Sequence, residues 1–279
     1  MHTVNEIINI LDAELRTSGP GREYSNYQFT NNGSMLTLVA HIDTVCPPVG
    51  KVIHKKGKLY RHQSILGADD RAGCFVLDYL QKMDDKRFNY LYTDREESGG
   101  YGAKAFAYNN IGNADNKTQL YIEIDRHGTG HYATYEPISA SLELYLASRL
   151  SLVKARGSYS DIADISEILG VPSINLACGY YLEHTNNEYL VISELLKIFD
   201  ILEVLATELT PDIIGTIPID RPEQHYNSSL DYMDDGYEDY LGMSNTKKGG
   251  IKEYLDGDYE EYEKWYNTLS AKGDESWIA

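Results

Sequence analysis

The chain has 279 residues, 42% of them hydrophobic, and 25 basic against 43 acidic residues give it a formal net charge of −18. This length suits one large domain, with or without an appendage. So acidic a surface repels phosphate backbones and anionic lipid, which argues against nucleic-acid and membrane partners. No run approaches the roughly 18 apolar residues of a membrane span. The first residues lack a signal-peptide pattern, and Cys46, Cys74 and Cys178 form no close pair, so we expect a cytoplasmic protein without a disulfide scaffold.

The first half of the chain alternates helical and extended patterns. Ile7, Ile8 and Leu11 recur at helical spacing, whereas short, compact apolar runs are typical of buried strands. The expected elements are, in order, a helix at 4–15, a strand at 34–39, a hairpin at 51–61 that turns at Lys56-Gly57-Lys58, a helix at 72–83, a strand at 88–93, a short helix at 102–108 and a strand at 119–124.

The second half continues this alternation up to a long amphipathic helix. The expected elements are a segment at 142–153 that fits either state, a helix at 160–169 capped by Ser160 or Asp161, a strand at 171–177, and a helix at 192–209 that Thr210-Pro211 stops. Strands that alternate with helices predict an α/β sandwich in which at least part of the sheet is parallel.

The last part of the chain has a different composition. Residues 216–279 hold 15 acidic against 6 basic residues, half of the net charge, and 8 of the 24 tyrosines, with few aliphatic residues. We therefore expect a main domain at 1–215 and an acidic, tyrosine-rich appendage at 216–279 that contains a helix at 252–269.

Acids and histidines gather at the ends of the expected strands. They are His41, Asp69, Glu96, Glu97, Asp125 and His184. That edge is where open α/β sheets bind ligands. A single carboxylate there is usually a helix cap or a solvated group, but several with two histidines supply the nitrogen and oxygen ligands that suit Zn²⁺, Mn²⁺ or Co²⁺.

Two neighbouring pairs suggest what such a centre would do. Asp43 lies two residues after His41, close enough to accept the free ring N–H and to fix the tautomer that coordinates a metal. Glu96 and Glu97 are adjacent at a strand end, so their side chains point to opposite sides. One can bind a metal while the other acts as a general base.

The motifs that carry these residues resemble, in order, those of the co-catalytic di-zinc exopeptidases, the M20/M28/M42 metallopeptidase clan. They are His41-Ile42-Asp43, Asp69-Asp70-Arg71-Ala72-Gly73, Glu96-Glu97, Ile122-Glu123-Ile124-Asp125 and His184-Thr185-Asn186-Asn187-Glu188. The resemblance covers about residues 35–210 and implies a three-layer sandwich with a mixed, mostly parallel central sheet flanked by helices, the zinc exopeptidase or phosphorylase/hydrolase-like fold.

The resemblance also implies a role for each motif residue. Asp69 would bridge two divalent metal ions, most often Zn, with Co or Mn as alternatives. His41 and Asp125 would complete one metal, and Glu97 and His184 the other. Glu96 would be the general base for a water held between the metals, and Asp43 would orient His41.

Spacing narrows the family. Asp125 and His184 are 59 positions apart, and His41 and Asp69 are 28 apart. Neither gap holds the extra domain of M20 or M42 enzymes, so the core is most similar to M28, although the His184 motif is nearer to M20. Without the lid that pairs M20 subunits, a monomer is favoured, but the oligomeric state stays open.

An aminopeptidase that acts on small peptides is the first choice, by analogy with lidless M28 cores. The alternatives are a carboxypeptidase, or an amidase or deacylase that acts on N-acyl amino acids or cell-wall peptides. A non-catalytic binding protein on this scaffold is disfavoured, because all five ligands and the base are retained. Arg126 could pair with a substrate carboxylate, although such an arginine more often pairs with a neighbouring acid, and Tyr181 could shape the substrate pocket, although a packing role is more common.

Overall fold

The computed structural model describes residues 4–12, 27–61 and 64–215. The chain divides into a unit of Met1–Pro222 and a unit of Glu223–Ala279, and all described residues belong to the first. The expected appendage at 216–279 and its helix at 252–269 lie outside the described residues, so they stay predictions. Within the described part, no helix has both the length and the apolar character needed to cross a membrane.

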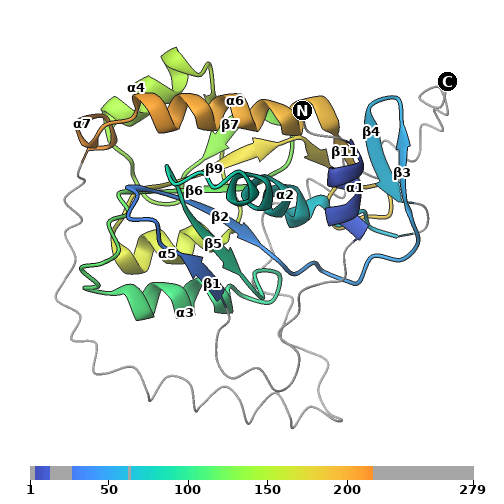
Figure 1. Cartoon of the computed structure of the whole chain (residues 1–279), viewed down its shortest axis with the longest axis horizontal. Coiled ribbons are helices and arrows are strands. Elements are labelled where there is room, and N and C mark those ends of the chain that lie inside the picture. The colour runs from blue at the N-terminus through green and yellow to red at the C-terminus, as the bar shows by residue number, and fades with distance from the viewer. Residues whose placement is uncertain (1–3, 13–26, 62–63, 216–279) are drawn as a thin grey trace, which may run out of the picture. The chain divides into compact units, whose positions relative to one another are not determined.

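A seven-stranded mixed sheet forms the centre of the described unit (Figure 1). Its strands, in spatial order, are β1 (Tyr27–Thr30), β5 (Asn89–Thr93), β2 (Leu36–His41), β6 (Leu120–Arg126), β9 (Ser173–Cys178), β7 (Thr129–Ala133) and β8 (Val153–Lys154). The four strands β5, β2, β6 and β9 run parallel, β1 is antiparallel to β5, β7 is antiparallel to β9, and β8 is parallel to β7. The prediction of a mixed, mostly parallel sheet is confirmed.

A second, four-stranded sheet contains the predicted hairpin. Its strands are β3 (Val52–Lys55), β4 (Lys58–Arg61), β10 (Tyr180–Tyr181) and β11 (Tyr189–Val191), in the order β10-β11-β4-β3. Lys56 and Gly57 have φ of 52° and 75°, as a two-residue hairpin turn requires. Because β11 pairs with β4, the segment after β9 lies beside the hairpin.

Helices cover both faces of the central sheet (Figure 1). They are α1 (Val4–Asp12), α2 (Ala68–Lys82), α3 (Tyr101–Asn110), α4 (Ala140–Arg149), α5 (Asp161–Leu169), α6 (Ile192–Glu208) and α7 (Pro211–Ile214). Helix α4 followed by β8 resolves the ambiguous segment at 142–153. Ser160 stands at the N-cap position of α5, but its side chain makes no capping hydrogen bond.

Core packing on both faces supports the central strands β2 and β6. Strands β2 and β6 are buried on both faces, as parallel strands between two helical layers are. Leu38 and Ile122 pack toward α2 and α6, whereas Val39 and Tyr121 pack toward α3 and α5. The carboxyl ends of these strands are therefore fixed by packing on both sides.

Candidate metal centre

The six predicted acids and histidines meet at one edge of the central sheet. His41 ends β2, Asp125 lies near the end of β6, and Glu96 and Glu97 follow β5. His184 follows β9 and the short strand β10, and Asp69 lies in the first turn of α2. Since β5, β2, β6 and β9 are parallel neighbours, their carboxyl ends form a single ligand-binding edge.

Asp69 lies between the two histidines. Its Oδ1 is 3.0 Å from Nε2 of His41, and its Oδ2 is 3.2 Å from Nε2 of His184. Asp125 Oδ1 lies 3.8 Å from the same His41 nitrogen, and Glu97 Oε1 lies 3.0 Å from the same His184 nitrogen. The result is two donor sets, each with one imidazole and two carboxylates, that share Asp69; within each set the donor atoms lie within 4.8 Å of one another.

The chemistry of both sets fits a divalent cation. Burial by itself would lower the pKa of His41. Asp125, Asp43 and Asp69 raise it by more than burial lowers it, so the pKa ends well above its usual range. Burial also lowers the pKa of His184, but Asp69 and Glu97 outweigh it and raise this pKa to about 11. Each imidazole therefore lies in a field that favours positive charge, and the mixed nitrogen and oxygen donors are those of zinc sites that keep an open position.

Asp70 has a different environment from Asp69. It is buried, its Oδ1 accepts the backbone N–H of Gly73 at 3.0 Å, and its Oδ2 has no hydrogen-bond partner in the described part of the chain. A Cβ on Gly73 would come within 2.5 Å of the Asp70 carboxylate and 2.7 Å of the backbone oxygen of Ile124. Only glycine allows α2 to approach β6 this closely, which carries Asp69 into the site.

Asp43 connects His41 to the loop after β5. Its backbone oxygen lies 3.1 Å and its Oδ1 3.4 Å from Nδ1 of His41. Its carboxylate accepts the backbone N–H groups of Glu96 and Glu97 at 3.1 and 3.2 Å. One side chain can thus set both the tautomer of His41 and the position of the two glutamates.

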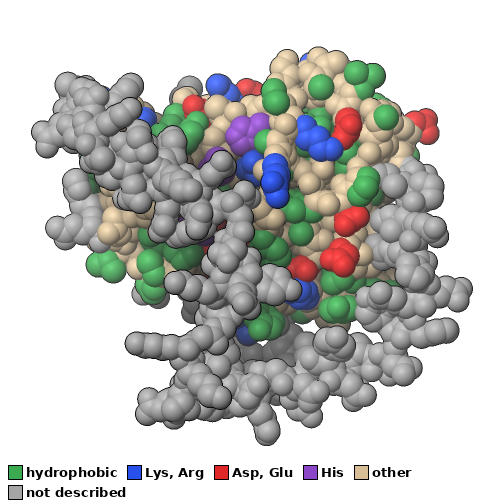
Figure 2. All heavy atoms as spheres, turned by 180° about the vertical axis from the view of Figure 1, so that it is seen from behind, with side chains coloured by type: hydrophobic (Ala, Val, Ile, Leu, Met, Phe, Trp, Pro, Cys, Tyr) green, Lys and Arg blue, Asp and Glu red, His purple; other side chains and the backbone are tan. Residues whose placement is uncertain are grey.

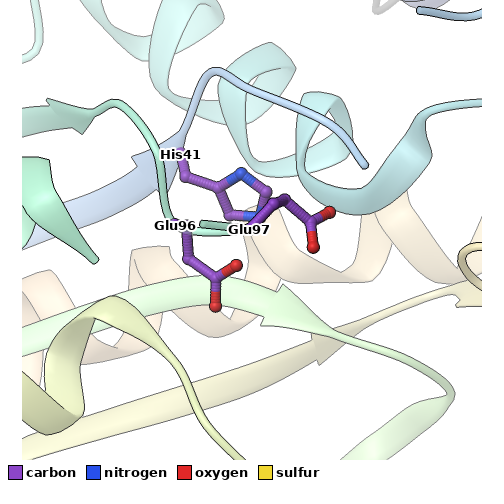
Figure 3. Close-up of side chains that lie close together, drawn as sticks. All are labelled: His41, Glu96 and Glu97. Carbon is purple, nitrogen blue, oxygen red and sulfur yellow. The ribbon is translucent and has the colours of Figure 1, made fainter. Parts of the chain in front are cut away.

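Glu96 and Glu97 point in different directions beside His41 (Figure 3). Glu97 reaches His184, whereas Glu96 makes no side-chain hydrogen bond to any residue that the structure describes, and its carboxylate lies in a further donor group with His41 and Glu97. Burial raises the pKa of Glu96 to about 8; His41 opposes this rise, and Asp161 and the neighbouring acids add to it. A carboxyl group that titrates near neutral pH is suited to general-base work.

Glu188 is a site residue to which the sequence pattern gave no role. Its buried carboxylate accepts the backbone N–H groups of Gly67, Ala68 and Asp69 at 2.8, 2.7 and 3.2 Å. It therefore joins the His184 segment to the segment that carries Asp69. The signal in the sequence was an acid four positions after a candidate ligand, which alone does not show its partners.

A second acidic layer lies beneath the centre and was also missed. Glu123 accepts hydrogen bonds from the Ser160 hydroxyl and from Nδ2 of Asn175, the latter at 3.1 Å. Asp161 accepts one from the Thr93 hydroxyl. Each of the two acids keeps one buried oxygen without a hydrogen-bond partner among the described residues, and burial raises the pKa of both.

The two predicted substrate residues lie on different strands, Arg126 at the end of β6 and Tyr181 on β10. Tyr181 donates its hydroxyl to Glu194 at 2.7 Å and stacks on Tyr189, so its substrate role stays a prediction. The neighbouring Tyr180 is the tyrosine that reaches the donors, because its buried hydroxyl donates to Asp125 Oδ1 at 3.0 Å. Arg126 is half-buried and contacts His131 and the backbone of Arg156.

Comparison with known families gives one match. Residues 26–159 match the model of Peptidase family M28. The matched segment contains four of the five proposed metal ligands and both glutamates, and it ends before His184. No curated protein matches the chain.

Several solved structures are similar to the chain. They include the aminopeptidase PepT from Bacillus cereus, at 18% identity over 64% of this chain and 79% of that one, with a TM-score of 0.48. A tripeptidase from Staphylococcus aureus is similar at 17% identity over 64% of this chain and 84% of that one, with a TM-score of 0.49. The zinc aminopeptidase BSAP from Bacillus subtilis is similar at 15% identity over 63% of this chain and 47% of that one, with a TM-score of 0.44.

Proposed function

Because residues 26–159 of this chain match the model of Peptidase family M28, we propose that this metallopeptidase is an aminopeptidase that uses two zinc ions. The observation that carries the proposal is the position of Asp69, whose two oxygens each face a separate pair of one histidine and one carboxylate. His41 and Asp125 would hold one ion with Asp69, and Glu97 and His184 the other. Cobalt or manganese would suit the same donors.

When bound, the two cations would polarise the scissile carbonyl and acidify a water molecule. Glu96 would accept the proton of the attacking water and later deliver it to the leaving amine. Asp43 would hold His41 in the tautomer that presents Nε2, and Asp69, Glu97 and Asp125 would balance most of the charge of two divalent ions.

The choice of an aminopeptidase rests on the absence of an inserted lid. Between Asp125 and His184 the chain forms β7, α4, β8, α5, β9 and β10, all parts of the two sheets or of the helices that cover the central sheet. By analogy with other lidless cores, the free amino end of a short peptide would reach the centre. A cytoplasmic location and action as a monomer belong to the same proposal.

Metal analysis of the full chain combined with a substrate panel tests this function. We expect about two equivalents of zinc, chelator-sensitive hydrolysis of aminoacyl-nitroanilides and dipeptides, and no hydrolysis when the amino end is acylated. Hydrolysis of N-acyl amino acids instead would identify a deacylase. Less than one equivalent of metal and no hydrolysis of any substrate would revive the non-catalytic binding protein.

A further inference from the structure

We propose that Arg126 binds a carboxylate of the substrate, so that this site selects short peptides whose free carboxyl end, or an acidic side chain, lies near the scissile bond. The proposal rests on the peptidase function proposed above. It concerns which peptides are taken, not whether the centre hydrolyses them.

Arg126 is the chain neighbour of one of the proposed metal ligands, Asp125. It directly follows Asp125 on β6, and consecutive Cα atoms are about 3.8 Å apart. The pairing of β6 with β9 shifts register between Glu123 and Arg126, and such irregularities redirect side chains next to active sites. Because the backbone of Arg126 adjoins that of Asp125, an anion held by Arg126 would lie close to the proposed centre.

The guanidinium of Arg126 makes hydrogen bonds, but none of them is to a carboxylate of a described residue. Its Nε donates to Nδ1 of His131 at 3.0 Å, and its Nη2 donates to the backbone oxygen of Arg156 at 2.7 Å. These two bonds use two of the five N–H donors of an arginine. Among the residues that the structure describes, Arg126 has no acidic partner, whereas Arg61, Arg87 and Arg149 each pair with an acid.

The two bonds that Arg126 makes also hold it in place. His131 has to be neutral at Nδ1 to accept from Arg126, and burial, Arg126 and His127 all lower the pKa of His131. A guanidinium fixed by a neutral acceptor and a carbonyl keeps its full charge, and its planar fork matches a carboxylate. Fixing it in advance reduces the entropy that substrate binding would cost.

The surroundings of Arg126 lie along the rim of the proposed centre. The ring of His131 lies 6.1 Å from that of His127, and His127 Nδ1 lies 2.8 Å from Oε1 of Glu183, the residue before the ligand His184. Figure 2 shows histidine side chains beside basic ones on one face of the molecule. In a chain of net charge −18, which repels anionic substrates over most of its surface, such a local cation is needed to receive a carboxylate.

The test measures kcat/KM for three forms of one tripeptide: the free acid, its C-terminal amide, and the amide with glutamate as third residue. Metal-loaded wild type is compared with Arg126→Met and with Arg149→Met, a matched control whose arginine pairs with Glu208. We expect wild type and the control to prefer the acid over the amide by about tenfold or more. Arg126→Met should lose most of this preference, and Arg126→Lys should keep part of it.

The third substrate identifies the source of the carboxylate. If wild type but not Arg126→Met favours the glutamyl amide, the arginine binds an acidic side chain. If wild type favours only the free acid, the arginine binds the carboxyl terminus. Equal hydrolysis of acid and amide by wild type, or a preference that survives Arg126→Met, would overturn the proposal. If wild type cleaves none of the peptides, it is the peptidase function that fails. A second measurement needs no variant: it compares the inhibition of wild type by the dipeptide product with inhibition by the amide of that dipeptide, and the free acid should inhibit more strongly.

Discussion

The two adjacent glutamates after β5 have different surroundings, and we therefore expect their substitutions to affect different properties, metal binding for one and turnover for the other. Glu97 lies 3.0 Å from His184, so Glu97→Gln should reduce bound metal. Glu96 lies at the centre without a side-chain hydrogen bond, so Glu96→Gln should leave metal content unchanged and lower kcat by roughly 10²–10⁴-fold. Metal analysis and steady-state kinetics on both variants check this. Near-normal turnover by Glu96→Gln would assign the base to another group.

Asp161 makes the stability of the metal-free protein depend on pH. Burial raises its pKa to about 7, whereas an unfolded aspartate titrates near 3.9. The folded state therefore keeps the proton that the unfolded state loses, and this contribution is full below pH of about 4 and disappears as pH rises through about 7.

Asp161→Asn should remove that part of the pH dependence. Between pH 5 and pH 7 the stability of wild type should fall relative to the variant by on the order of 1.4 kcal/mol per pH unit at most. Urea unfolding of chelator-treated protein at several pH values measures the difference. Parallel curves for the two proteins would mean that Asp161 is ionised throughout.

Single residues of the site differ in how far the sequence predicted them. The clustering of the proposed ligands was predictable, because they follow apolar runs that form strands, and strand ends meet at one edge. Glu188 and Asp161 were not, because their partners are distant in sequence: Glu188 binds Gly67 across 121 positions and Asp161 binds Thr93 across 68. Such contacts depend on tertiary packing, and no local pattern encodes them.

Two elements, α2 and the segment that leads into β11, are held together by Glu188, and this link predicts the cost of breaking it. In Glu188→Gln one acceptor oxygen remains, but the new amide N–H₂ faces backbone N–H donors. Leaving one of these donors unsatisfied should cost about 1–3 kcal/mol of stability. Because Asp69 moves with this segment, metal affinity should fall as well.

Urea unfolding and chelator competition measure both effects, at pH 8, above the pKa of Glu188 of about 7. Glu143→Gln is the matched control, since Glu143 is exposed and pairs with Lys154, and exposed pairs contribute about 1 kcal/mol or less. If Glu188→Gln behaved like this control, the carboxylate would not position the Asp69 segment.

At the level of elements, the sequence predicted the buried parts best. The strands β2, β5, β6 and β9 were expected, because parallel strands covered on both faces are continuous apolar runs. The strands β1, β7, β10 and β11 were missed; β1 is a partly exposed edge strand, and β10 and β11 have two and three residues. The start of α2 was placed too late, because Asp69 and Asp70 have non-helical backbone angles in its first turn.

For the whole molecule, the division of the chain at Pro222 predicts what truncation does. All proposed ligands lie in the unit Met1–Pro222. A chain that ends at Pro222 should therefore fold, bind the same amount of metal and keep its kcat/KM within about threefold. Thermal unfolding, metal analysis and light scattering check this. A change in mass in solution or a large loss of activity would give residues 223–279 a part in assembly or in the site.

The five donors come from segments between His41 and His184, and they meet only when β9 has joined β6 and β11 has joined β4. The unfolded chain has no such site, so a cation held by the proposed ligands would bind the native state alone and draw the folding equilibrium toward it. A cell short of that metal would then lose more than turnover. Chains of this protein made during the shortage would open more often and be degraded sooner, so that its abundance would follow the supply of metal.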